Sequence, residues 1–262
     1  MSKRISQYLF LLLLLSLSPY NSYGNDAQRE SVIISKTHAD SLYSSGAYEQ
    51  AIDAYKKIIK EKGFSPELYY NLGNSYYKVN DMAHAILNYE RGLKLDPSDS
   101  DLRHNLSIAR SKIQDKSSSP SEFFIVAWWK SLSNLLSLNQ LKLLGLIFFS
   151  LFLASLIYMA MQNKESKNAY LKYTSAFLFF LFLICNLFAY QQYRNIVSTK
   201  CGIVTAESVN VKSSPSKNSM DLFEIHSGTR LTILDNSMKE WIEIRYEDEK
   251  EGWIEKETIE LI

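Results

Sequence analysis

Hydrophobic residues gather in three runs along the chain, and two of these runs are long. Leu143–Met161 and Thr174–Tyr190 contain no charged residue and are long enough to cross about 30 Å of hydrocarbon. The alternative is a pair of buried helices in a soluble protein. Each run is apolar on all faces, however, which a small soluble domain could not cover. The pattern therefore predicts two transmembrane helices, over residues 138–162 and 171–191.

The first run, Tyr8–Leu17, follows a basic start and ends before Pro19, with Ser22 and Gly24 at the positions expected of a cleavage site. This order is typical of a secretory signal peptide, which we predict over residues 1–24. The alternative is an uncleaved membrane anchor, but a run of roughly ten apolar residues is shorter than the ~20 that span a bilayer.

The short connection between the two long runs, residues 163–170, is predicted to lie in the cytoplasm. Lys164, Lys167 and the nearby Lys172 outnumber Glu165 there, and short loops rich in lysine face the cytoplasm. A signal peptide exports the N-terminal part of the chain. Both topology arguments therefore place the two flanking domains outside the cytoplasm.

The region before the long runs repeats itself at a distance of 34 residues. A 34-residue period is typical of tetratricopeptide helix-turn-helix repeats, so we predict an α-solenoid over residues 28–116. The matching pairs are Ser41 and Ser75, Tyr43 and Tyr77, Ala51 and Ala85, Ile52 and Ile86, Tyr55 and Tyr89, Lys60 and Lys94, Leu68 and Leu102, Asn71 and Asn105, and Leu72 and Leu106.

The spacing within a repeat has a packing reason. Gly73 and Ala85 are expected where two helices cross closely, and Leu72, Tyr76 and Tyr89 fill the space around that crossing at helical intervals. Two further positions are expected to start a helix, with Ser65 as the N-cap and Pro66 in the first turn.

The first and third copies depart from this pattern. The first copy has Ala39 at the small position and His38 where leucine is usual, and we expect His38 to be packed in the core. The third copy is only a first helix, about Asp99–Asp115, which we expect to cover the open end of the stack.

The linker at residues 117–137 is predicted to form an amphipathic helix at the membrane surface. Its apolar side chains fall at helical intervals, and polar ones occupy the other side. The alternative is packing against the end of the solenoid. The apolar positions are Phe124, Trp128, Leu132, Leu135 and Leu136, and the polar ones are Lys130, Ser131, Asn134 and Ser137.

After Arg194 the pattern changes to short alternating runs, which predict a small all-β barrel over residues 198–262. In "VNVKSSPS", in the Gly-Thr before "LTIL" and in "GWI", the region resembles the bacterial SH3-like family, some of whose members bind cell-wall peptides through exposed aromatic side chains. Tyr246 and Trp253 are candidates for such a surface, although both could instead complete the core. The residues that carry the resemblance are Asn210, Val211, Ser214, Pro215, Gly228, Trp241, Gly252, Trp253 and Ile254.

Charge and motifs exclude several classes of function. A formal net charge of +1 gives no basis for nucleic-acid binding. The histidines are scattered and form no metal or catalytic motif, and the segment "DPSDSD" lacks the glycine and glutamate of a calcium loop, so helix capping is the better interpretation. We therefore expect no enzyme activity, no cofactor and no metal. The histidines are His38, His84, His104 and His226.

Taken together, these elements describe a multidomain membrane protein with an α-solenoid, two transmembrane helices and a small all-β SH3-like barrel. Their order resembles the BatE proteins of bacterial aerotolerance operons, on the segments "LYYNLGNSYYK", "AILNYERGLKLDP", "NVKSSPS" and an FFxxxWW motif in "FFIVAWW". The resemblance implies a non-catalytic scaffold in the inner membrane, facing the periplasm. It also implies membrane partners with von Willebrand A-type domains and a link to oxidative stress.

The concave face of the solenoid is where a protein or peptide partner would bind. First helices form that face in tetratricopeptide proteins, and an asparagine there can hold the backbone of a ligand. The same residues could equally be solvated surface, and a rival reading is a peptidoglycan-binding protein that acts through its barrel. The candidate residues are Tyr43, Tyr70, Asn71, Asn74, Tyr77, Arg103 and Asn105.

Overall fold

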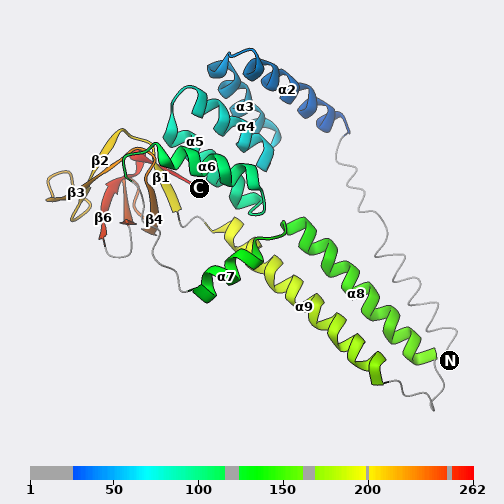
Figure 1. Cartoon of the computed structure of the whole chain (residues 1–262). Helices are drawn as coiled ribbons and strands as arrows, with labels where there is room; N and C mark the ends of the chain where they lie inside the picture. The colour runs from blue at the N-terminus through cyan, green and yellow to red at the C-terminus, as the bar shows by residue number, and fades with distance from the viewer. Residues whose placement is uncertain (1–25, 116–123, 162–168, 199–200, 247–249) are drawn as a thin grey trace. The chain divides into compact units, whose positions relative to one another are not determined.

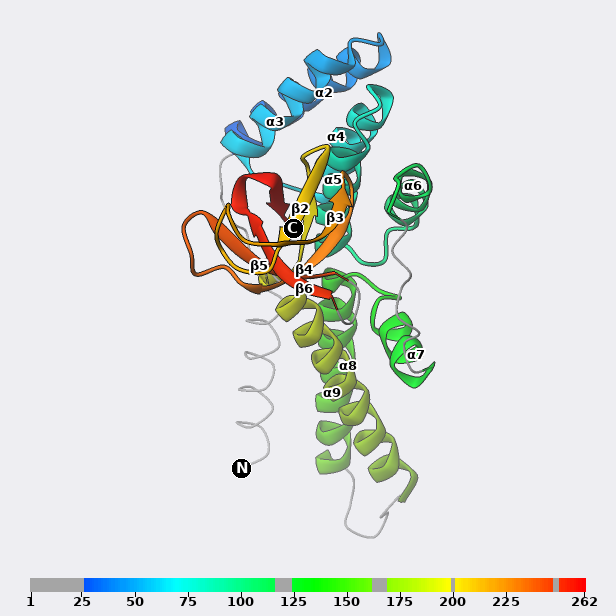
Figure 2. The same cartoon turned by 90° about the vertical axis from the view of Figure 1, so that its left-hand side faces the viewer.

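The computed structural model describes residues 26–115, 124–161, 169–198, 201–246 and 250–262 (Figures 1 and 2). The predicted signal peptide and most of the predicted cytoplasmic loop lie outside these residues. The chain forms two compact units. One has its described part in Leu136–Arg194, and the other combines Ala27–Leu135 with Asn195–Ile262.

The second unit holds the solenoid, a short helix and the β domain. The solenoid helices are α2 (Asp26–Ser44), α3 (Tyr48–Lys62), α4 (Pro66–Lys78), α5 (Met82–Leu95) and α6 (Ser100–Ser111), and the short helix is α7 (Phe124–Ser133). The β domain comprises β1 (Cys201–Val204), β2 (Ser208–Lys212), β3 (Asp221–His226), β4 (Arg230–Asp235), β5 (Trp241–Tyr246), β6 (Lys250–Glu255), a 3₁₀ turn η1 (Lys256–Thr258) and β7 (Ile259–Leu261).

The 34-residue repeat also holds for the backbone of the turns. Gly46 and Asn80 are 34 residues apart, and both adopt a left-handed conformation, with φ of 84° and 65°. A left-handed residue after a helix lets the following amides reach its last carbonyls. Accordingly, the N–H groups of Ala47 and Asp81 donate to the carbonyls of Leu42 and Tyr76. The repeat is thus a repeat of hairpin geometry as well as of side chains.

Close helix crossing within the second hairpin depends on Gly73. A Cβ at this position would lie 2.6 Å from Cε1 of Tyr89, so the tyrosine ring occupies the space that the missing side chain leaves. Two helix starts are capped as their sequence predicts. The Ser65 side chain accepts a hydrogen bond from the N–H of Leu68, and Asp99 accepts from the N–H of Leu102.

The predicted core position of His38 is wrong, because this side chain is exposed. Its equivalent in the second repeat, Leu72, is 3% exposed and shares a hollow with Ile59 of α3. Among the described residues the solenoid begins with α2. No described helix before α2 therefore covers His38 in the way that α3 covers Leu72. A leucine is therefore not required there, and Ala39 beside it is the buried residue.

The β domain is one antiparallel sheet in the order β3-β2-β6-β5-β4-β1-β7. The predicted closed barrel is wrong, because no ladder joins the outer strands β3 and β7 among the described residues. The edge strand β7 has only three residues. Within the sheet, β2 meets β6 in a single register pair, Lys212 with Trp253.

The core of the sheet follows the predicted alternation. Val209 and Val211 of β2 and Ile242 and Ile244 of β5 are buried, with more exposed residues between them. Gly252 of β6 has no room for a side chain, because a Cβ would collide with Val211. This glycine therefore allows β6 to pass close to β2.

The other unit contains two antiparallel helices, α8 (Leu138–Met161) and α9 (Ala169–Val197), both long and apolar enough to cross a membrane. They lie side by side in Figures 1 and 2. Phe149 faces Phe182 at 5.0 Å between ring centroids, and the Ser155 and Ser175 hydroxyls are 2.8 Å apart. In the most apolar stretches of α8 and α9, only 6% and 17% is buried. The core helix of a soluble protein is mostly buried.

Candidate functional site

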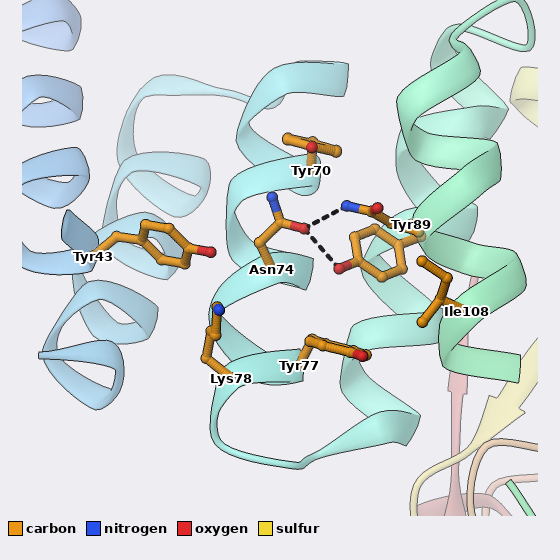
Figure 3. Close-up of a pocket in the computed structure, with 8 residues that line it drawn as sticks. Tyr43, Tyr70, Asn74, Tyr77, Lys78, Tyr89 and Ile108 are labelled. Atoms are coloured by element: carbon orange, nitrogen blue, oxygen red, sulfur yellow. Dashed lines mark hydrogen bonds between the residues drawn. The ribbon is translucent and has the colours of Figure 1, made fainter. Parts of the chain in front are cut away.

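A groove of about 250 Å³ lies on the inner face of the solenoid, where first helices of successive repeats line up (Figure 3). Tyr43 comes from α2 and Ile108 from α6, while α4 supplies the centre of the wall. Tyr89 of α5 reaches into the same space from the second helix of its hairpin. The complete lining is Tyr43, Tyr70, Asn74, Tyr77, Lys78, Tyr89, Asn105 and Ile108.

Asn74 is at the centre of this groove. Its Oδ1 accepts two hydrogen bonds, from the Tyr89 hydroxyl at 2.7 Å and from Nδ2 of Asn105 at 2.8 Å (Figure 3). These bonds fix the orientation of the Asn74 amide. Within the described part of the chain, its Nδ2 has no partner, and neither does Oδ1 of Asn105. The groove therefore offers one amide donor and one amide acceptor, which is what the backbone of an extended peptide requires.

Aromatic rings surround these amides. Tyr43 and Tyr77 face the groove, and Lys112 holds its ammonium 4.2 Å from the centre of the Tyr77 ring. Burial raises the pKa of Tyr43 and of Tyr89, so both hydroxyls stay neutral at physiological pH. Lys78 is the only charged residue in the lining. The groove is thus suited to an uncharged or weakly acidic segment with apolar side chains.

Two predicted candidates lie outside the groove lining. The Nδ2 of Asn71 donates to Oδ1 of Asp40 at 3.2 Å, and the Tyr55 hydroxyl donates to the same oxygen at 2.5 Å. Asn71 therefore joins α4 to α2 and α3. Arg103 donates to the carbonyls of Pro97 and Ser98, so it supports the turn before α6.

Three lining residues were not among the sequence candidates, namely Lys78, Tyr89 and Ile108. A signal for two of them was available. Ile108 lies 34 residues after Asn74, so it occupies the same place in the next repeat. Lys78 lies one helical turn after Asn74 and shares its face. Tyr89 gave no such signal, because it is a core residue, 1% exposed, that also reaches the groove with its hydroxyl.

The outer face of the solenoid contacts the β domain through α5. Glu260 of β7 lies 3.3 Å from Nη2 of Arg91 and 3.5 Å from Nε2 of His84. Arg91 also donates to the carbonyl of Leu261 at 2.7 Å, and Lys94 donates to the carbonyl of Ser198 at 2.7 Å. Side chains of one helix thus bind backbone and side-chain oxygens of the β domain.

His84 is charged at neutral pH because it lies between two carboxylates. Hydrogen bonds to Asp81, at 2.7 Å, and to Glu260 raise the pKa of His84 to about 9. The same histidine lowers the pKa of Glu260, with Arg91 adding to the effect. The contact is therefore a network of opposite charges rather than a single ion pair.

A second contact joins the end of the solenoid to the turn between β3 and β4. The Asp115 carboxylate accepts from the N–H of His226 at 2.6 Å and from the Thr229 hydroxyl at 2.9 Å, and lies 3.1 Å from Nδ1 of His226. These donors lower the pKa of Asp115. Ile113 packs against Gly228. A Cβ added to Gly228 would lie 2.6 Å from Cγ2 of Ile113. This glycine has φ of 87°, so the turn favours glycine for two reasons.

The two aromatic candidates of the β domain are neither buried nor fully exposed. Tyr246 packs 6.2 Å from Phe223 between ring centroids, and Lys250 lies 5.8 Å above its ring. Trp253 sits in β6 opposite Lys212 and Glu243. Both rings are therefore half-packed against their own sheet.

The acidic segment before α6 serves to cap that helix, as expected. Oδ1 of Asp96 accepts from the N–H and the hydroxyl of Ser98, and Asp99 caps the helix. Among the residues that the structure describes, no three His, Cys, Asp or Glu side chains group closely enough to hold a metal ion.

Comparison with known families agrees with both domains. Residues 39–80 and 66–99 match models of the tetratricopeptide repeat, and residues 207–260 match the bacterial SH3 domain. Among curated proteins, the chain is similar to mouse (Mus musculus) Tetratricopeptide repeat protein 16, with 25% identity over 87 residues. The match covers 33% of this chain and 11% of the mouse protein, so the chain spans only a small part of that protein's length. Tetratricopeptide repeats are protein-interaction modules, and bacterial SH3 domains are associated with binding the cell wall.

Proposed function

We propose that the protein is a non-catalytic, membrane-anchored scaffold that binds an extended segment of a partner protein in its solenoid groove. The observation that carries the proposal is the pair of unused amide groups on Asn74 and Asn105, enclosed by tyrosine rings. A strand-like peptide presents alternating donors and acceptors, and the amide groups of Asn74 and Asn105 are partly exposed in the groove, where such a backbone could pair with them. A peptide backbone satisfies both groups, and its apolar side chains fill the space between the rings.

The anchor in this proposal is the helix pair α8 and α9, with both soluble domains in the periplasm. The topology rests on the signal peptide and on the lysine-rich connection between the helices. The order of elements resembles the BatE proteins of aerotolerance operons. On that resemblance, the bound segment belongs to an inner-membrane protein with a von Willebrand A-type domain, in a complex linked to oxidative stress.

Binding in the groove is tested with the full chain in lipid nanodiscs and overlapping peptides from such von Willebrand A-type membrane proteins. We expect Asn74→Ala to weaken the best peptide about tenfold, which corresponds to about 1.4 kcal/mol. Asn210→Ala is the matched control, because its amide lies on the exposed surface of the β domain beside Asp221. The proposal fails if no peptide binds, or if both substitutions act equally.

A second candidate function is binding of peptidoglycan by the β domain. It is favoured by the match to the bacterial SH3 domain and by the half-exposed rings of Tyr246 and Trp253. Sedimentation of the full chain with purified peptidoglycan tests it. Retention that Trp253→Ala abolishes, in a protein that binds none of the peptides, would favour this function over the scaffold.

A further inference from the structure

Helix α7 turns its apolar side chains outward. Ile125, Trp128 and Leu132 are 53%, 64% and 40% exposed. At about 100° per residue, they share one stripe of the helix with Phe124 and Trp129. Leu135, in the turn that follows, is 68% exposed. No acidic residue occurs in the helix.

Burial in α7 does not follow polarity. Ser133, one helical turn after Trp129, is 3% exposed. A helix at the surface of a soluble protein buries its apolar stripe and exposes its polar side. In α7 a serine is buried and a tryptophan is exposed. We therefore do not expect the apolar stripe to face water.

We propose that the apolar stripe of α7 lies in the interfacial layer of the lipid bilayer, as a helix parallel to the membrane surface. Only four residues separate the end of α7 at Ser133 from the start of α8 at Leu138. If α8 spans the bilayer, as proposed above, this short connection keeps α7 within reach of the surface. Tryptophan favours the depth of the lipid headgroups, where its ring is apolar and its N–H meets polar groups.

A stripe that lies in the interfacial layer does not pack against the solenoid. The stripe carries large apolar side chains, and interfacial helices bury such a face among headgroups and upper acyl chains. Residues 112–123 join α6 to α7 in the sequence, so the helix would hold the solenoid within the length of this connection from the membrane. A partner held in the groove would be kept near the bilayer.

Quenching of tryptophan fluorescence by brominated lipids tests the proposal with the full chain reconstituted in phosphatidylcholine and phosphatidylglycerol vesicles. Two of the four tryptophans lie in α7. We expect phosphatidylcholine brominated near the carbonyl end of its acyl chain to lower total emission by up to about half. Lipid brominated near the methyl end is expected to quench less. In Trp128→Phe/Trp129→Phe, most of the quenching should disappear.

Three results would overturn the proposal. In one, wild type and the double variant are quenched equally. In another, lipid brominated near the methyl end is the stronger quencher, which would place α7 deep in the bilayer. In the third, iodide in the water quenches the α7 tryptophans while the brominated lipids do not. Extraction of the vesicles at high pH reports separately on α8 and α9, so loss of the membrane anchor is distinguishable from loss of the α7 contact.

Discussion

The inner and outer faces of the solenoid differ in how their polar groups are satisfied. On the inner face, Asn74 and Asn105 keep an amide donor and an amide acceptor unused beside neutral tyrosines. On the outer face, His84 and Arg91 are both engaged with Glu260 of the β domain. One surface of the same repeats is therefore occupied from within the chain, and the other is the surface that we propose for a partner.

This difference follows from the hairpin architecture. First helices α2, α4 and α6 line the groove, while the second helix α5 carries the outer contacts. His84, Arg91 and Lys94 are spaced by seven and three residues, which places them on one side of α5. The β domain thus occupies the side of α5 that points away from the groove.

The largest expected effect is a loss of stability at Tyr89, which lines the groove and also belongs to the core. Tyr89→Ala removes a fully buried ring and should lower the free energy of unfolding by about 3–5 kcal/mol. Tyr70→Ala is the matched control, because its ring is only partly buried, and should cost about 1 kcal/mol or less. Urea unfolding of the full chain in detergent measures both. Equal losses would mean that Tyr89 does not anchor the hairpin.

Next in size is the contact at Asp115. Asp115→Ala leaves the Thr229 hydroxyl, in a residue that is 1% exposed, without its acceptor, and an unpaired buried hydroxyl costs about 1–3 kcal/mol. We expect faster hydrogen exchange at the N–H of His226 and in the β3–β4 turn. Asp101→Ala, in an exposed first turn, should leave that exchange unchanged. Identical exchange in both variants would contradict the contact.

The charge network at His84 predicts a smaller, pH-dependent effect. Its pKa rises from 6.5 to about 9 on folding, so its contribution is full below pH 6.5 and is lost as the pH rises through about 9. Because Glu260 is nearly half exposed, we expect less than about 1 kcal/mol. Thermal unfolding between these two pH values should show this slope.

His84→Gln should flatten that slope, and His104→Gln is the control, since His104 is exposed on α6. Glu260 and Asp81 have lowered pKa values, so their contribution is present above their ordinary values, 4.5 and 3.8, and is lost as the pH falls below them. A slope that survives in His84→Gln would assign the effect to another group.

The smallest effect is expected at Arg103. Its guanidinium binds the carbonyls of Pro97 and Ser98 and is exposed, so Arg103→Ala should change the free energy of unfolding by about 0.5 kcal/mol or less. Peptide binding in the groove should stay within about twofold of wild type. A tenfold loss of affinity would return Arg103 to the binding surface.

The solenoid was predictable in detail because its physics is local and repeated. The 34-residue period, the cap at Ser65 and the small residue at Gly73 all act within one hairpin. The error at His38 has the same origin, since the period describes a repeat with neighbours on both sides. A terminal repeat keeps the sequence register and loses one neighbour.

Contacts between distant segments could not be predicted in this way. Nothing in the local pattern of Glu260 or Asp115 indicates a partner more than 100 residues away. The prediction of a closed barrel failed for a similar reason. Alternation predicts which strands form, but it does not predict whether β3 and β7 pair. Five of the seven groove candidates line the groove. The other two, Asn71 and Arg103, found partners inside the solenoid.

Photo-cross-linking of the full chain in its own membrane tests the contrast between the two faces most directly. A photo-reactive phenylalanine replaces Tyr70 on the inner face or Arg91 on the outer face. We expect the probe at position 70 to join the chain to another polypeptide, and the probe at position 91 to join α5 to β7 of the same chain. Adducts with other polypeptides at position 91, and none at position 70, would contradict this expectation.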